Sequence, residues 1–403
     1  MLSQQPSLPS APSSPKPYRF FRLVVLCCCL AGGAVALVYL VKTVREYLRP
    51  GARSYAEGME AVARKDPDEA EKKWLQGVEK DPKYVPNLVQ LGDLYATERR
   101  SQEAVLCYWR AEKLTPNDGS LLLRLARVEH LINRDDLAYP HSKRAAELLP
   151  NNATAQARYG LLEVKQGHYP AAILPLRLAL TLHNETREVT DALVDSQFSS
   201  KDVAGAERTN EDWLRKHPDD PLANLWRAKI AAQKPATPDN QRITLEAAEK
   251  AYKALPDSLE AHHVLGQAYL NLNRPADAIK VFQDGIDIVP FAVDMLQGLV
   301  SGYARLRDAP HLQLVSARLK DLNSKLDRLD HVREIAILHH GKDLESNFQL
   351  AQMESEVGHF QTAQDYFNQL EQDAPNDKRI QAAAAAFRMR VKLYKQGKVR
   401  VLP

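Results

Sequence analysis

The sequence predicts an all-α protein, a solenoid of helix–turn–helix repeats preceded by one transmembrane helix. Three observations predict this fold class. Glycine is scarce, at 17 of 403 residues, whereas the helix formers Ala, Leu, Glu, Lys and Arg are common. Alanines and prolines recur with a period of 34 residues over most of the chain. Near the amino terminus, Leu23–Val41 contains no charged residue over 19 positions.

The amino-terminal fifty residues divide into a tail and a membrane-spanning segment. Residues 1–19 contain five prolines and several serines with little to bury, so we expect a disordered tail. Residues 20–42 should form the transmembrane helix, because Leu23–Val41 is about 28 Å long as a helix and a hydrocarbon core is roughly 30 Å thick. A cleaved signal peptide is the competing interpretation, although its apolar core is usually shorter, about 7–15 residues. Three basic residues precede the apolar run and four follow it, a difference too small to select an orientation.

The charge distribution gives no reason to expect nucleic-acid binding. The net charge is +3, but residues 1–50 hold six basic groups and one acidic group, which leaves 48 basic and 50 acidic groups in the rest of the chain. A body with a charge of about −2 has no electrostatic attraction to a phosphate backbone. The basic character therefore belongs to the membrane end.

The 34-residue period has the physical content of two packed helices. The recurring small residues and prolines are Ala70, Ala104, Ala138, Ala172 and Ala206, and Pro82, Pro116, Pro150, Pro218 and Pro290. Within residues 85–118, two helical faces are formed by Leu88, Leu91, Gly92 and Tyr95, and by Ala104, Val105, Tyr108 and Ala111. Gly92 and Ala104 are small where the two helices should cross, and Pro116 ends the second helix. Neither helix buries its face alone, but stacked neighbours do.

This order of large, small, aromatic and proline positions resembles the tetratricopeptide repeat, a helix–turn–helix unit of 34 residues. Residues 259–292 match the repeat equally well, through Leu265, Gly266, Tyr269, Ala278, Phe282 and Pro290. The resemblance implies a right-handed superhelix whose inner groove is lined by the first helix of each repeat. When weak units are included, about nine repeats cover most of residues 51–377.

The repeats are not uniform, and their departures from the pattern set the predicted boundaries. Repeat 221–258 carries four extra residues, which indicates a longer turn. After residue 306 the pattern fades, although Leu329, Val332 and Ala336 still form part of a helical face. The predicted boundaries are 51–306 for the array, 307–343 for a degenerate repeat and an extra helix, 344–377 for a further repeat, and 378–396 for a capping helix.

The sequence contains no pattern that indicates catalysis. The nucleotide-binding, hydrolase and zinc-protease motifs are all missing, and Cys107 is the only cysteine outside the apolar segment. One thiol does not form an internal disulfide or a zinc site. We therefore predict no catalytic residue, no metal site, no cofactor and no small-molecule substrate, and expect that the protein is not an enzyme.

The candidate site is the inner groove that the resemblance implies. In this family, positions 2, 5, 9 and 12 of a repeat face the groove. The residues that these positions select are Ala157, Leu161, Val164, Glu188, Asp191, Asp195, Phe198, Glu260, His263, Gln267, Asp294 and Gln297. An apolar patch is followed by an acidic one, so our hypothesis is a strip that binds a partner segment with basic and apolar side chains. The competing interpretation is an ordinary solvated polar face.

The function predicted from these features is that of a membrane-anchored scaffold or adaptor, which holds a protein or peptide partner in its groove and is attached to the membrane through Leu23 to Val41. Two alternatives stay open. One is an envelope or lumenal quality-control accessory that binds unfolded clients, and the other is a subunit of an enzyme complex without its own active site. The layout of one span followed by repeats resembles bacterial membrane-anchored assembly factors. We therefore expect a single-pass protein of a bacterial inner membrane, with the side of the repeats undetermined.

Overall fold

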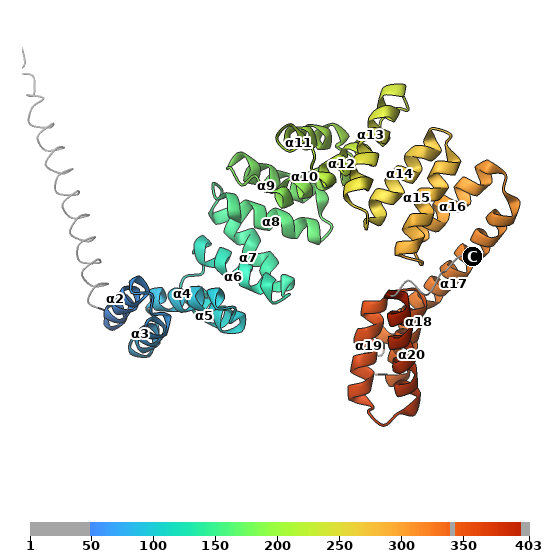
Figure 1. Ribbon diagram of the computed structural model, residues 1–403. Coiled ribbons are helices and arrows are strands. Elements are labelled where there is room, and N and C mark those ends of the chain that lie inside the picture. The colour runs from blue at the N-terminus through green and yellow to red at the C-terminus, as the bar shows by residue number, and fades with distance from the viewer. Residues whose placement is uncertain (1–48, 339–342, 396–403) are drawn as a thin grey trace, which may run out of the picture. The chain divides into compact units, whose positions relative to one another are not determined.

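The computed structural model describes residues 49–338 and 343–395, and the described part of the chain is entirely helical (Figure 1). The predicted tail, 1–19, and the predicted span Leu23–Val41 lie outside the described residues. Among the helices that are described, none combines the length and the apolar character needed to cross a bilayer. The structure divides into two compact units, Met1–Leu162 and Glu163–Pro403, with the boundary inside one helix.

Consecutive helices pair into repeats, as the 34-residue period predicts. The first unit holds α2 (Pro50–Ala63), α3 (Pro67–Lys80), α4 (Val85–Thr97), α5 (Ser101–Leu114), α6 (Gly119–Leu131) and α7 (Asp135–Leu148), and α8 (Ala153–Lys165) contains the boundary. The second unit holds α9 (Tyr169–Thr181), α10 (Arg187–Ser199), α11 (Val203–Lys216), α12 (Pro221–Ala232), α13 (Pro238–Ala254), α14 (Leu259–Asn271), α15 (Pro275–Ile288), α16 (Val293–Leu306), α17 (Ala309–Leu338), α18 (Leu344–Glu356), α19 (Phe360–Asp373) and α20 (Lys378–Lys395). Even-numbered helices are the first helices of their repeats, and odd-numbered helices are the second.

The helix boundaries follow from local capping chemistry. Side chains such as Asp118, Thr186 and Asp220 accept hydrogen bonds from backbone N–H groups in the first turn of the helix that follows. Most first helices end two residues before a left-handed residue at position 15 of the repeat. These residues are Lys65, Arg99, Asn133, Gly167, Lys201, Asn273, Arg307 and Gly358. The turn between the two helices therefore has one recurring geometry, which keeps successive repeats in phase.

The recurring small residues mark the places where the helices of a repeat touch. Ala70, Ala104 and Ala278 are all fully buried. The crossing of the two helices is not the only reason why the first helix carries a glycine. The glycine also faces an aromatic ring of the second helix. A Cβ atom on Gly92 would lie 2.4 Å from the Tyr108 ring, and one on Gly266 would lie 2.4 Å from the Phe282 ring. The glycine therefore accommodates the aromatic ring of the second helix.

A buried carboxylate links three helices of the first unit. Glu129 on α6 has no exposed surface, and it accepts a hydrogen bond from the Trp109 Nε1 group of α5 at 2.9 Å. His141 of α7 places Nδ1 2.7 Å from the other oxygen of Glu129 and Nε2 3.4 Å from Glu112. Burial by itself lowers the pKa of His141, but the hydrogen bond to Glu129 and the charges of Glu129 and Glu112 raise it above the ordinary value of 6.5.

Raising the pH should weaken this contact. Because the pKa of His141 is higher in the folded state than in the unfolded state, its stabilisation is complete below about pH 6.5 and is lost as the pH rises through the folded-state value. We expect the free energy of unfolding of the wild-type chain to fall by on the order of 1 kcal/mol more than that of His141→Gln over this range. Urea unfolding at a series of pH values measures the difference, and parallel profiles for the two chains would contradict the assignment.

Helix α17 differs from the sequence-based expectation. Residues 309–338 form one continuous helix of 30 residues, where we expected a degenerate repeat and an extra helix over 307–343. Its buried residues recur every seven positions, and they are Val315, Leu322, Leu329 and Ala336. No glycine or proline occurs between His311 and Leu338, so this apolar face is continuous. The additional residues therefore lengthen a second helix instead of forming a separate one.

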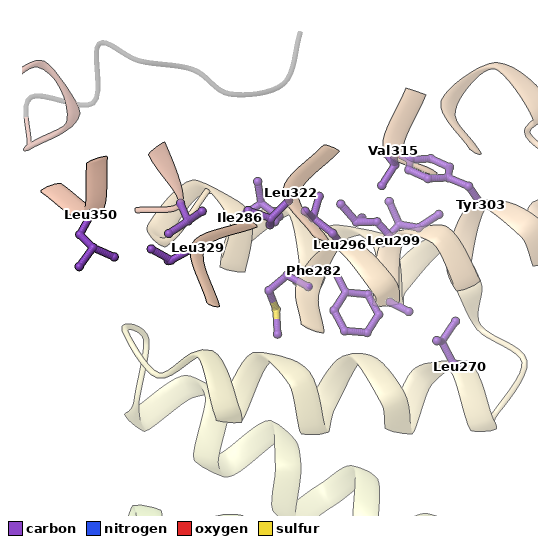
Figure 2. Packing of buried hydrophobic residues seen from close by; sticks show 14 of the residues in the cluster. Leu270, Phe282, Ile286, Leu296, Leu299, Tyr303, Val315, Leu322, Leu329 and Leu350 are labelled. Carbon is purple, nitrogen blue, oxygen red and sulfur yellow. The ribbon is translucent and has the colours of Figure 1, made fainter. Parts of the chain in front are cut away.

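The long helix lies along the main core of the second unit. Figure 2 shows Leu322 and Leu329 of α17 beside Ile286 of α15, and Val315 beside Tyr303 of α16. Helix α17 also packs against α18, where Arg333 of α17 donates to Glu354 of α18. One face of α17 thereby lies against helices of three repeats, α15, α16 and α18.

The last three helices form a small core of their own and return to an earlier repeat. Phe348, Phe367 and Phe387 are the aromatic members of this core. The Phe360 ring at the start of α19 lies edge-on to Phe291, which follows α15, with 6.2 Å between the ring centroids. The Tyr394 hydroxyl of α20 donates a hydrogen bond to the Ile288 carbonyl. Helix α20, where a capping helix was expected over 378–396, thus also contacts the end of α15.

Candidate functional site

The first helices of successive repeats in the second unit carry a connected row of side chains. The Trp226 indole of α12 donates a hydrogen bond to Asp191 of α10, and its ring lies 5.6 Å from that of Phe198 between centroids. The Lys229 ammonium lies 3.7 Å from the centroid of the Trp226 ring and 2.5 Å from the Glu260 carboxylate of α14. We call Asp191, Phe198, Trp226, Lys229 and Glu260 the Trp226 strip. It joins three repeats through a cation over an aromatic ring and charged hydrogen bonds.

Helical spacing and capping explain why these side chains meet. Asp191, Asp195 and Phe198 lie at i, i+4 and i+7 on α10, so they share one face. Helix α12 begins with Pro221 behind a cap in which Asp220 accepts from the Ala223 N–H group at 2.9 Å. Because α10 packs against α12 and α12 against α14, the faces of all three helices form one surface.

The carboxylates on this surface are not equivalent. Burial raises the pKa of Asp191, while the hydrogen bond from Trp226 and the charge of Arg187 oppose the rise. Asp191 therefore contributes to the contact between repeats as well as to the charge of the surface. Asp195 accepts a hydrogen bond from the Ser199 hydroxyl at 3.1 Å and is partly exposed, and Glu188 is exposed. Glu188 and Asp195 are thus the carboxylates most available to a partner.

The remaining predicted groove residues differ in exposure. Ala157 is only 4% exposed, so it offers a partner almost no surface. Leu161 and Val164 are half-buried on α8, Leu161 in the first unit and Val164 in the second. His263 and Gln267 are half-buried on α14, and the His263 ring lies 6.5 Å from that of Phe282 between centroids. Asp294 and Gln297 are exposed on α16. The structure joins Asp191, Phe198 and Glu260 into one strip, and no described contact adds the others to it.

Sequence reasoning missed Trp226 and Lys229, which connect the strip. No groove residue was predicted in repeat 221–258, although its four extra residues follow Ala232 and do not shift the register of α12. The position rule used for the other repeats selects Lys229 as position 9. Trp226 has no comparable signal, because its partner Asp191 lies 35 residues earlier in the chain.

The described residues contain no arrangement that indicates a metal site or an activated nucleophile. Within residues 49–338 and 343–395, His, Cys, Asp and Glu side chains form no group of three or more that is placed to hold a metal ion. Burial raises the pKa of the Cys107 thiol to about 11, so the thiol is protonated at neutral pH. Cys107 therefore acts as a packing residue of the first unit.

Comparison with known proteins gives one family match. Residues 244–293, from α13 to the start of α16, match the model of the tetratricopeptide repeat family. No curated protein matches the sequence.

Several solved structures are similar to parts of the chain. pilF of Pseudomonas aeruginosa is 15% identical over 54% of this chain and 97% of its own, with a TM-score of 0.42. A MamA fragment from Desulfovibrio magneticus RS-1 is 19% identical over 42% of this chain and 97% of its own, with a TM-score of 0.37. The complex of Naa15 and Naa10 bound to HypK-THB matches 86% of this chain and 67% of its own at 14% identity, with a TM-score of 0.41.

Proposed function

The chain is a tetratricopeptide repeat protein, and we propose that it is a scaffold that holds a protein partner on the first-helix side of its repeats. We further propose that the segment Leu23–Val41 attaches this scaffold to a membrane, which the sequence supports through its length and its lack of charge. On this proposal the protein has no catalytic centre of its own. It increases the local concentration of its partner at the bilayer.

The observation that supports partner binding best is the Trp226 strip with its neighbouring carboxylates. Aromatic rings that are half-exposed and held in place by hydrogen bonds give binding energy at a low cost in conformational entropy. Phe198 and Trp226 are both half-buried, and Glu188 and Asp195 lie on the same helix as Phe198. A partner segment with basic side chains around an apolar one complements this surface in charge and in polarity.

Reversing two of these charges should release such a partner. We expect Glu188→Lys with Asp195→Lys to weaken partner binding roughly tenfold, since each attraction becomes a repulsion. The full-length chain, extracted in mild detergent, is used to capture partners from its host for mass spectrometry. Asp191 is unsuitable for this test because its loss would also break the contact with Trp226.

The matched control carries the same charge change on second helices. Glu211 of α11 and Asp287 of α15 are exposed, and Glu211→Lys with Asp287→Lys should leave capture unchanged. One dominant protein that is lost only with the Glu188 and Asp195 variant supports the scaffold proposal. Equal capture by both double variants contradicts it, and a diffuse set of unrelated proteins favours the quality-control alternative.

A further inference from the structure

Two hollows on the second-helix side of the second unit occupy equivalent places in two repeats. One has a volume of about 840 Å³ in repeat 187–220 and lies between α9 and α11, above α10. The other has a volume of about 780 Å³ in repeat 344–377 and lies between α17 and α19, above α18. The floor of each is made by positions 4, 7 and 11 of the first helix. These residues are Thr190, Leu193 and Gln197 in one, and Asn347, Leu350 and Glu354 in the other.

The residue at position 11 explains why the hollow in repeat 187–220 is open. Repeats 85–118 and 259–292 have Tyr95 and Tyr269 at this position. The hydroxyl groups of these tyrosines donate hydrogen bonds to Glu71 and Glu249 of the preceding second helix, at 2.8 and 3.0 Å, so the rings cross the gap between two second helices. In repeat 187–220 the shorter Gln197 accepts a hydrogen bond from Thr209 within its own repeat at 2.9 Å. The gap between α9 and α11 is therefore not filled by the chain itself.

The hollow between α9 and α11, which we call the α9–α11 cleft, has a basic rim. Lys216 is paired with Glu185 at 2.6 Å and Arg215 with Asp212. Two further cations of the rim, Arg177 and Arg208, are exposed and form no ion pair or hydrogen bond with the described residues. Four cations against two carboxylates leave the lining with an excess of two positive charges.

The interior of the α9–α11 cleft is partly apolar. Leu180 of α9, Leu193 of α10 and Trp213 of α11 line it beneath the charged rim. A volume of 840 Å³ lies within the range of about 300–1,000 Å³ that is typical of ligand sites. The cleft thus combines a partly apolar lining with two unpaired guanidinium groups, which suit bidentate contacts to carboxylates.

We propose that the α9–α11 cleft binds a short acidic segment of a partner protein. Carboxylates of the segment contact Arg177 and Arg208, and one apolar side chain lies against Leu180 and Trp213. A nucleic acid fits less well, because Glu185 and Asp212 repel phosphates and only two cations are unpaired. This site lies on the second-helix side, whereas the Trp226 strip lies on the first helices, so both sites can be occupied at once.

Charge reversal at the rim tests the proposal. The probe is a short fluorescein-labelled peptide of glutamates around a central leucine, and the full-length chain in mild detergent is titrated against it by fluorescence anisotropy. We expect Arg177→Glu with Arg208→Glu to weaken binding roughly tenfold or more. The control, Lys250→Glu with Lys280→Glu, reverses two exposed cations outside the cleft and should bind as the wild type does.

A second variant tests the location without changing charge. Gln197→Tyr places in this repeat the residue that Tyr95 and Tyr269 provide in others, so it should fill the cleft and weaken peptide binding to the same extent. Circular dichroism confirms that the variant is folded. Wild-type affinity in the folded Gln197→Tyr chain, an equal loss in the control, or tighter binding of a DNA oligonucleotide than of the peptide would each overturn the proposal.

Discussion

Replacing Phe282 with alanine should destabilise the second unit by about 3–5 kcal/mol, the range found for large aromatic residues in cores. The ring has no exposed surface and lies among the residues of the main core, as Figure 2 shows. Two glycines from consecutive first helices make room for it. A Cβ atom on Gly266 or Gly298 would lie 2.4 or 2.5 Å from the ring. With no side chain on either glycine to move into the space, the cavity should stay open.

Chemical denaturation of the full-length chain, followed by circular dichroism, measures this loss. Leu306→Ala is the matched control, since Leu306 is 46% exposed at the end of α16 and should change the free energy of unfolding by no more than about 0.5 kcal/mol. A denaturation midpoint for Phe282→Ala equal to that of the control would show that the glycine pocket collapses around the smaller side chain.

Replacing Arg333 with methionine should cost about 2–4 kcal/mol. Glu354 of α18 is 1% exposed, and it accepts hydrogen bonds from Arg333 Nε at 3.1 Å and Nη2 at 2.7 Å. Its other oxygen lies 2.7 Å from His359 Nδ1. Without the guanidinium group, the described contacts leave the buried carboxylate of Glu354 with the His359 imidazole alone, so its charge is poorly compensated.

The second substitution in this test removes the carboxylate itself. Glu354→Leu combined with Arg333→Met should recover much of the lost stability, because the buried charge is then absent. Arg328→Met is the control on the same helix, since exposed Arg328 only donates to the Ser324 carbonyl at 3.2 Å. Thermal unfolding compares the variants, and equal melting temperatures for the single and double variants would contradict a charge-based cause.

Much of the repeat architecture could be predicted from the sequence, because each packing constraint acts at a fixed position of the repeat. Ala104 must be small beside the first helix, and Gly92 must be small beside Tyr108, so both residue types recur with the period. The long helix α17 was missed for a related reason. Its buried residues follow a period of seven, so a search at 34 residues registers only a fading pattern there.

The candidate site was predictable only in part. Position rules select Asp191, Phe198 and Glu260 one repeat at a time, and the structure places them in one strip. The indole that joins them, Trp226, contacts a residue in the preceding repeat. A contact between two repeats depends on the angle through which one repeat is rotated relative to the next. The residue pattern within a single repeat does not determine this angle. The α9–α11 cleft has only part of a sequence signal. Gln197 stands where three other repeats have tyrosine, but Glu129, Glu163 and Ala231 occupy the same position in further repeats.

The return of the last helices to α15 changes how this part of the chain should fold. In an open solenoid each repeat touches only its neighbours, so stability is a sum of local terms and the ends fray independently. Here the Tyr394 hydroxyl is bonded to a carbonyl 106 residues earlier, and Phe360 lies against Phe291. The segment between these contacts is a closed loop, and α20 cannot detach without exposing part of the end of α15. The final repeats are therefore expected to open together as one cooperative unit, not one after another from the carboxyl end.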